Sequence, residues 1–136
     1  MNIIEVRAKI AATPSTVWAF LGDFGGVAAW NPFVVSAEIS GEGVGMTRAI
    51  TAAGGARIVE RLESIAAGER HLRYSVLLES GVISTADIRL DQDDAGETVI
   101  VWQSIRESDL TPDQQDAIAS TLRSRIDALA QAVAAA

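Results

Sequence analysis

The sequence predicts an α+β domain: a curved sheet of seven antiparallel strands wrapped around a long C-terminal helix, with two short helices between strands one and two. Three observations support this fold class. Short apolar segments separated by turn residues fill residues 34–105, which is typical of strands. A capped segment with helical periodicity follows at 111–133. A shorter capped segment begins at Thr13, directly after the first strand pattern.

The N-terminal part of the chain predicts a strand followed by two short helices. Residues 2–11 alternate between apolar and polar side chains and indicate the first strand. Thr13 can cap the first helix, and Pro14 fits its first position because proline has no N–H to leave unpaired there. Glycines at 25–26 interrupt this helix, and a second short helix is expected over 27–30.

The middle of the chain predicts six further strands joined by short connections. Short, regular spacing favours an antiparallel meander, since parallel strands need longer crossovers. The turns are expected near Gly41–Gly45, Gly54–Gly55, Ala66–Gly68, Ser80–Gly81 and Asp93–Gly96.

The last segment predicts one long amphipathic helix that begins at a capping box. Thr111 and Gln114 have the spacing of that motif, with Pro112 at the first helical position. Over about 24 residues such a helix is ~36 Å long. It can cover one face of the sheet, and the space between becomes a cavity if the sheet curves. Its apolar face consists of Ile118, Leu122, Ile126, Leu129 and Val133.

Strand alternation places polar side chains on the face that is expected to be buried. Arg48 and Glu60 share the inward parity of their strands, and the expected hairpin places them opposite each other. The same reasoning sets Glu60 opposite Tyr74, Tyr74 near Ile88, and Ile88 near Trp102. Opposite residues lie ~5 Å apart, so the five would form one transverse row. Arg73, Arg89 and Arg106, by contrast, are read as part of a solvated outer face.

We therefore predict a polar strip of Arg48, Glu60 and Tyr74 inside an otherwise apolar pocket, a mixture typical of small-molecule sites. An inward ion pair is costly unless it is hydrogen-bonded or partly hydrated. The alternative is that Arg48 and Glu60 lie near an open mouth and only pair with each other. The candidate ligand-binding residues are Trp30, Asn31, Phe33, Arg48, Ile50, Ile58, Glu60, Leu62, Tyr74, Val76, Ala86, Ile88, Trp102, Ile118, Leu122 and Ile126.

Composition narrows the functional classes. The 136 residues are expected to form one domain, 1–136. The net charge of −7 and the lack of a basic block argue against nucleic acid, and no apolar run is long enough for membrane insertion. With no cysteine and a single, outward-facing His71, we expect no metal and no cofactor. We expect a cytoplasmic monomer or homodimer.

Several segments, taken in order, resemble the START-like helix-grip superfamily (SRPBCC), which includes the birch-pollen-allergen type, the polyketide cyclase/dehydrase and lipid-transport type, and plant abscisic-acid receptors. The resemblance spans essentially the whole chain. It rests on ATPSTVWAFLGDFGGVAAWNPFV at 12–34, GEGVGMTRAI at 41–50, VERLESI at 59–65, LRYSV at 72–76, TVIVW at 98–102 and the C-terminal helix.

The resemblance implies a helix-grip fold around a hydrophobic cavity, with Glu60 and Arg48 facing that cavity as the matching residues do in the plant receptors. Those receptors hold a ligand carboxylate with a lysine, and the corresponding position here, near Asn31, has none. Their gate-loop motifs are also absent, since residues 80–85 read SGVIST. A hormone-receptor role is therefore not supported.

Three functions remain open at this stage. The first is binding of a small hydrophobic molecule, such as a lipid, polyketide, terpenoid or aromatic metabolite. The second is an enzyme of the polyketide cyclase/dehydratase type, with Glu60 as catalytic base and Tyr74 or Arg48 stabilising an enolate oxygen. The third is a co-chaperone-like interaction module.

Overall fold

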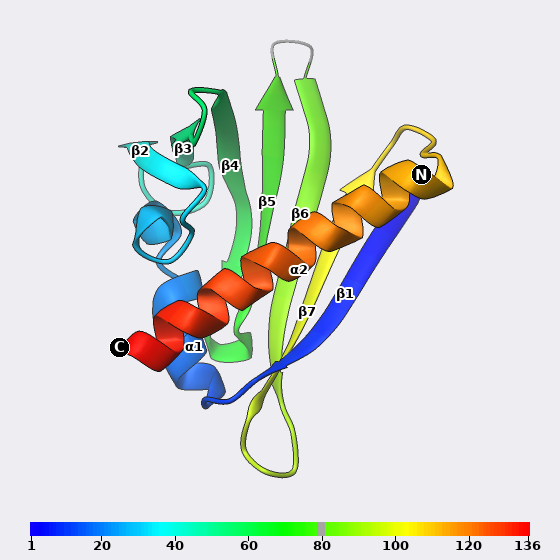
Figure 1. The fold of residues 1–136 in the computed structure, drawn as a ribbon. Helices are drawn as coiled ribbons and strands as arrows, with labels where there is room; N and C mark the ends of the chain where they lie inside the picture. The colour runs from blue at the N-terminus through cyan, green and yellow to red at the C-terminus, as the bar shows by residue number, and fades with distance from the viewer. Residues whose placement is uncertain (79–80) are drawn as a thin grey trace.

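The computed structural model describes residues 1–78 and 81–136 and contains one antiparallel sheet of seven strands in the order β1-β7-β6-β5-β4-β3-β2. The predicted fold class is confirmed (Figure 1). The predicted turn at Ser80–Gly81 lies partly outside the described residues. The strands are β1 (Asn2–Ile10), β2 (Val34–Ser40), β3 (Thr47–Ala52), β4 (Arg57–Ala66), β5 (His71–Leu78), β6 (Gly81–Gln92) and β7 (Thr98–Arg106).

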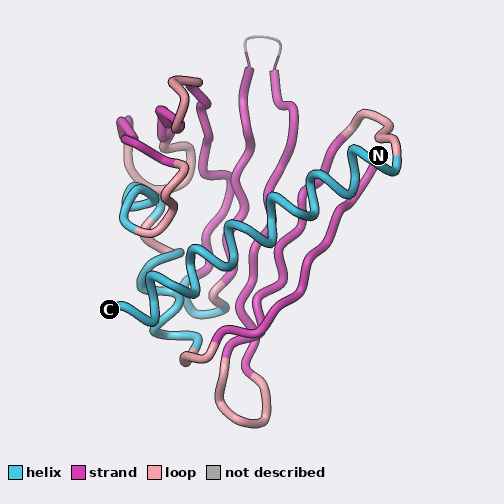
Figure 2. The backbone as a smooth tube through the Cα atoms, in the orientation of Figure 1, coloured by secondary structure: helices cyan, strands magenta, loops and turns pink. Residues whose placement is uncertain are grey.

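The long helix α2 (Pro112–Ala135) crosses the concave face of the sheet diagonally, as Figure 2 shows. Its N-terminus carries the expected capping box: Thr111 Oγ1 accepts a hydrogen bond from the Gln114 amide (3.2 Å), and Gln114 Oε1 accepts one from the Thr111 amide (2.9 Å). The buried residues of α2 are Leu122, Ile126, Leu129 and Val133, which follow the apolar stripe read from the sequence. No helix in the described ranges is both long and apolar enough to cross a bilayer.

Two short helical segments connect β1 to β2 and close one end of the molecule, beside the C-terminal end of α2 (Figure 1). Helix α1 (Pro14–Leu21) begins as predicted, because the Thr13 side chain accepts a hydrogen bond from the Thr16 amide. The second segment is a 3-10 helix, η1 (Phe24–Ala29), which begins earlier than the expected range of 27–30. The glycines at 25–26 lie within it, and the backbone of Gly26 departs from helical geometry, so the expected interruption takes the form of a kink.

The strand register agrees with the prediction at the two ends of the transverse row and differs in the middle of the row. Arg48 pairs with Glu60, as predicted. Glu60, however, lies opposite Val76, and Tyr74 lies opposite Leu62, so the predicted pairing of Glu60 with Tyr74 is wrong. The β4–β5 connection is longer than assumed, with a 3-10 turn η2 (Ala67–Glu69), a left-handed residue and a β-bulge after Leu62.

A second register difference separates β5 from β6. Tyr74 lies opposite Ala86 and not near Ile88, whereas Ile88 lies opposite Trp102 as predicted. A β-bulge near Val76 accompanies this shift. Both displacements amount to two residues, and an even displacement keeps a side chain on the same face of the sheet. The inward assignment of Tyr74 and Ile88 therefore survives although their neighbours change.

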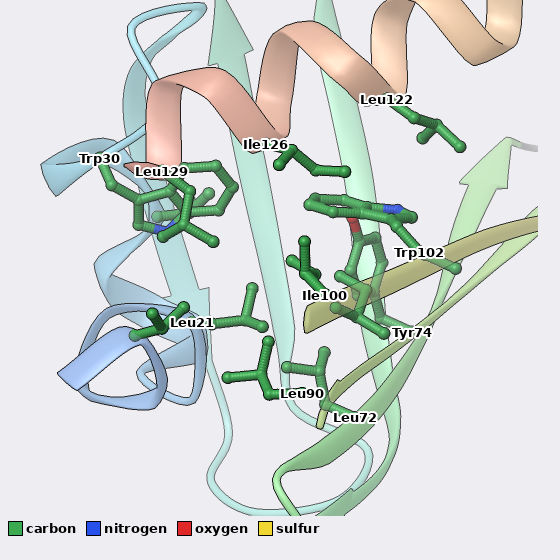
Figure 3. Close-up of a cluster of buried hydrophobic side chains, with 14 of the residues drawn as sticks. Leu21, Trp30, Leu72, Tyr74, Leu90, Ile100, Trp102, Leu122, Ile126 and Leu129 are labelled. Atoms are coloured by element: carbon green, nitrogen blue, oxygen red, sulfur yellow. The ribbon is translucent and has the colours of Figure 1, made fainter. Parts of the chain in front are cut away.

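The hydrophobic core lies between the concave face and α2 (Figure 3). Leu129 on α2 and Ile100 on β7 are fully buried. Leu72 and Leu90 pack below them on adjacent strands, and Leu21 of α1 closes the same end. Beside this packed end, the space under the middle of α2 is hollow and forms the candidate site.

Candidate functional site

The cavity consists of two adjoining compartments between the sheet and α2, each of about 310 Å³. The first compartment extends toward α1 and η1, and the second lies under the N-terminal half of α2. Six side chains line both compartments, so the two adjoin. The shared lining residues are Ile58, Glu60, Tyr74, Trp102, Thr121 and Arg125.

The predicted ion pair lines the first compartment and is buried, with Arg48 5% and Glu60 6% exposed. Arg48 Nε donates to Glu60 Oε1 at 2.8 Å, and Arg48 Nη1 donates to the Phe24 carbonyl at 2.8 Å. The guanidinium carbon also lies 3.9 Å from the ring centroid of Phe24 and 4.7 Å from that of Tyr74. These contacts compensate the desolvation of the charges and fasten η1 to β3. The alternative of a pair at an open mouth is therefore wrong.

Tyr74 lies at the boundary of the two compartments and lines both of them. Its ring packs against that of Phe24, with centroids 5.8 Å apart, and the residue is 4% exposed. Burial, followed by the negative charge of Glu60, raises the pKa of Tyr74 to about 12. The phenol is therefore protonated at neutral pH and can donate to a ligand oxygen.

The aromatic residues between η1 and β2 form one wall and the rim of the first compartment. The Trp30 and Trp102 rings meet edge to face, with centroids 6.4 Å apart. Asn31 is buried and accepts a hydrogen bond from the Phe33 amide through Oδ1 (3.1 Å), which fixes the turn into β2. Phe33 is 57% exposed, so it borders the rim of the compartment.

Most of the sequence-predicted binding residues meet at the cavity. Trp30, Asn31, Phe33, Arg48, Ile50 and Ile88 line the first compartment, Val76, Ala86, Ile118 and Leu122 line the second, and Ile58, Glu60, Tyr74 and Trp102 line both. Leu62 and Ile126 belong to the packed core and line neither compartment.

Sequence reasoning missed the polar lining of the second compartment. Arg106 faces this compartment, so its assignment to a solvated outer face is wrong. The signal was present, because Arg106 shares the inward parity of Trp102 and Ser104 on β7. Arg125 and Thr121 lie at the margin of the apolar stripe of α2, so helical periodicity alone does not identify them as lining residues.

The only histidine lies away from the cavity, on the convex face. His71 Nε2 is 3.0 Å from the carboxylate of Asp87, to which Arg73 also donates. This cluster is an outer-face ion-pair network and lines neither compartment. Within residues 1–78 and 81–136, no group of three or more histidine, cysteine or acidic side chains has the arrangement of a metal site.

Comparison with solved structures shows the same fold in proteins of low sequence identity. An uncharacterized protein from Bacillus thuringiensis has a TM-score of 0.82 and 18% identity, over 97% of this chain and 98% of that one. Ara h 8.0201 has a TM-score of 0.81 and 15% identity, over 99% of both chains. The Aha1 dimer from Colwellia psychrerythraea has a TM-score of 0.74 and 18% identity, over 98% and 96%. These similarities concern the fold alone. No curated protein matches the sequence.

The sheet wraps around the long helix α2 and leaves a cavity between them, and this arrangement defines the helix-grip fold. The sequence model of the family described as polyketide cyclase/dehydrase and lipid transport matches residues 1–136. The chain belongs to this family. The resemblance inferred from the sequence motifs is thereby confirmed.

Proposed function

We propose that this protein binds a small, mostly apolar molecule, such as a lipid, polyketide, terpenoid or aromatic metabolite, in the cavity between the sheet and α2. The main support is the cavity itself. Each compartment measures about 310 Å³. Small-molecule sites occupy roughly 300–1,000 Å³ and combine apolar walls with a few polar groups. The family's description, which includes lipid transport, agrees with such a role.

The arrangement of polar groups favours binding over acid–base catalysis. A catalytic base needs a lone pair within reach of the substrate proton. Among the described residues, Glu60 is the only carboxylate or imidazole in the lining of the two compartments, and its Oε1 already accepts a hydrogen bond from the Arg48 guanidinium, so the base would have to be the second oxygen of an ion-paired carboxylate. The cyclase or dehydratase alternative therefore has less support than binding. The similarities to solved structures concern only the fold, so they do not favour the co-chaperone-like alternative. The chain is acidic and contains no cysteine, so the cytoplasm remains the expected location. The expected assembly remains a monomer or homodimer.

The uncharged fluorophore N-phenylnaphthylamine tests the proposal, since it is apolar and brightens when it leaves water. We expect saturable binding of one molecule per chain. Ala52→Phe should weaken binding by about tenfold or more, because Ala52 lines the first compartment and a ring there displaces apolar contact with the ligand. Fluorescence titration gives the dissociation constants.

The matched control is Ala53→Phe, because Ala53 is the next residue along the chain, is exposed and does not line the cavity. This variant should bind the fluorophore like the parent protein. Equal weakening in both variants, or no saturable binding to the parent protein, would refute binding in the cavity.

A further inference from the structure

The second compartment has a polar lining that is dominated by hydrogen-bond donors and positive charge. It contains Arg106 on β7 and Arg125 on α2, together with the buried hydroxyls of Ser84 and Ser104. Glu60 is the only acidic side chain in its lining, and Arg48 already pairs with that carboxylate. The compartment is therefore suited to a group that accepts hydrogen bonds and carries negative charge.

Neither arginine is neutralised by another part of the described chain. Within residues 1–78 and 81–136, Arg106 and Arg125 form no salt bridge, whereas arginines on the sheet such as Arg57 and Arg61 pair with carboxylates. Arg106 Nε donates to the Ser104 hydroxyl at 3.3 Å. Burial and the nearby positive charge of Arg125 lower the pKa of Arg106 from its usual range. Two like charges held beside each other gain stabilisation from an anion placed between them.

We propose that the ligand is an organic acid, whose apolar body occupies the first compartment and whose anionic group, such as a carboxylate, binds Arg106 and Arg125 in the second. This inference rests on the proposed function and specifies its ligand class. Arg125 borders both compartments, so it lies where the two parts of such a molecule would join. The chain as a whole carries a charge of −7, so an anion is attracted by this local cluster and not by the overall charge.

Two fluorophores that differ by one sulfonate test the inference: uncharged N-phenylnaphthylamine and its anionic relative, anilinonaphthalene sulfonate. We expect the parent protein to bind the sulfonate more tightly. Arg125→Gln and Arg106→Gln should each weaken sulfonate binding by about ten- to hundredfold, the range of charge-assisted hydrogen bonds. Binding of the uncharged fluorophore should weaken much less than binding of the sulfonate, and thermal unfolding followed by circular dichroism reports that each variant is folded.

Two further variants separate a specific anion site from a general charge effect. Arg123→Gln removes the same charge from an exposed position two residues away on α2, and it should leave both affinities unchanged. Arg125→Lys keeps the charge and should retain most of the preference for the sulfonate. An equal affinity for both fluorophores in the parent protein, or a preference that persists when both Arg106 and Arg125 are replaced by glutamine, would overturn the inference. In either case, binding of the uncharged fluorophore would leave the proposed function standing. If neither fluorophore binds, the proposed function fails and this inference fails with it.

Discussion

Replacing Arg48 with methionine should lower the free energy of unfolding by about 3–5 kcal/mol, the usual cost of removing one partner from a buried ion pair. The substitution leaves the Glu60 carboxylate buried without its guanidinium partner. It also removes the hydrogen bond to the Phe24 carbonyl and the contacts of the guanidinium with the rings of Phe24 and Tyr74. Urea or guanidinium unfolding of both proteins at neutral pH measures the difference.

Two controls identify the cause of that loss. Arg57→Met breaks an ion pair whose side chains are 64% and 83% exposed, so it should cost no more than about 1 kcal/mol. The double variant Arg48→Met with Glu60→Leu should recover part of the stability, because it removes the orphaned carboxylate. A cost for Arg48→Met as small as that for Arg57→Met would show that the buried pair does not hold η1 to the sheet.

Replacing Trp102 with alanine should cost about 3–5 kcal/mol, the range measured when a large buried aromatic side chain is truncated. Trp102 is 1% exposed, lies on the face of β7 that α2 covers, and packs edge to face with Trp30. Trp102 lines both compartments, so its loss would join them into one larger cavity. The same denaturant titration gives the free-energy difference.

Phe33→Ala is the control for this second substitution. Phe33 also lines the first compartment but is 57% exposed, so its removal should cost less than about 1 kcal/mol. Similar losses for both variants would contradict the assignment of Trp102 to the core wall and Phe33 to the rim.

The sequence predicts the faces of the strands better than the pairs across them. Alternation along β5 identifies Tyr74 as inward, and it stays inward in the structure. Its partner depends on the length of the β4–β5 connection and on a bulge after Leu62, and neither changes the apolar pattern. A displacement of two residues therefore leaves the alternation of inward and outward side chains unchanged, whereas a displacement of one residue would place Tyr74 on the solvent side.

The candidate site is predictable where one strand pair sets the geometry and less so where separate elements meet. The Arg48–Glu60 pair follows from a single hairpin, and the structure reproduces it. Arg125 comes from α2, and its approach to Arg106 depends on how the helix rotates and crosses the sheet. Helix periodicity fixes which face of α2 is apolar but not which polar residue at its margin overhangs the cavity.

Ligand binding in the cavity is the central claim, and the indole N–H signals of the three tryptophans test it most directly. Trp30 and Trp102 line the cavity, whereas Trp18 does not, so the chain contains its own control. In proton–nitrogen correlation spectra, adding N-phenylnaphthylamine should move the Trp30 and Trp102 signals and leave that of Trp18 in place. Movement confined to Trp18, or no movement of any indole signal at saturating fluorophore, would contradict the claim.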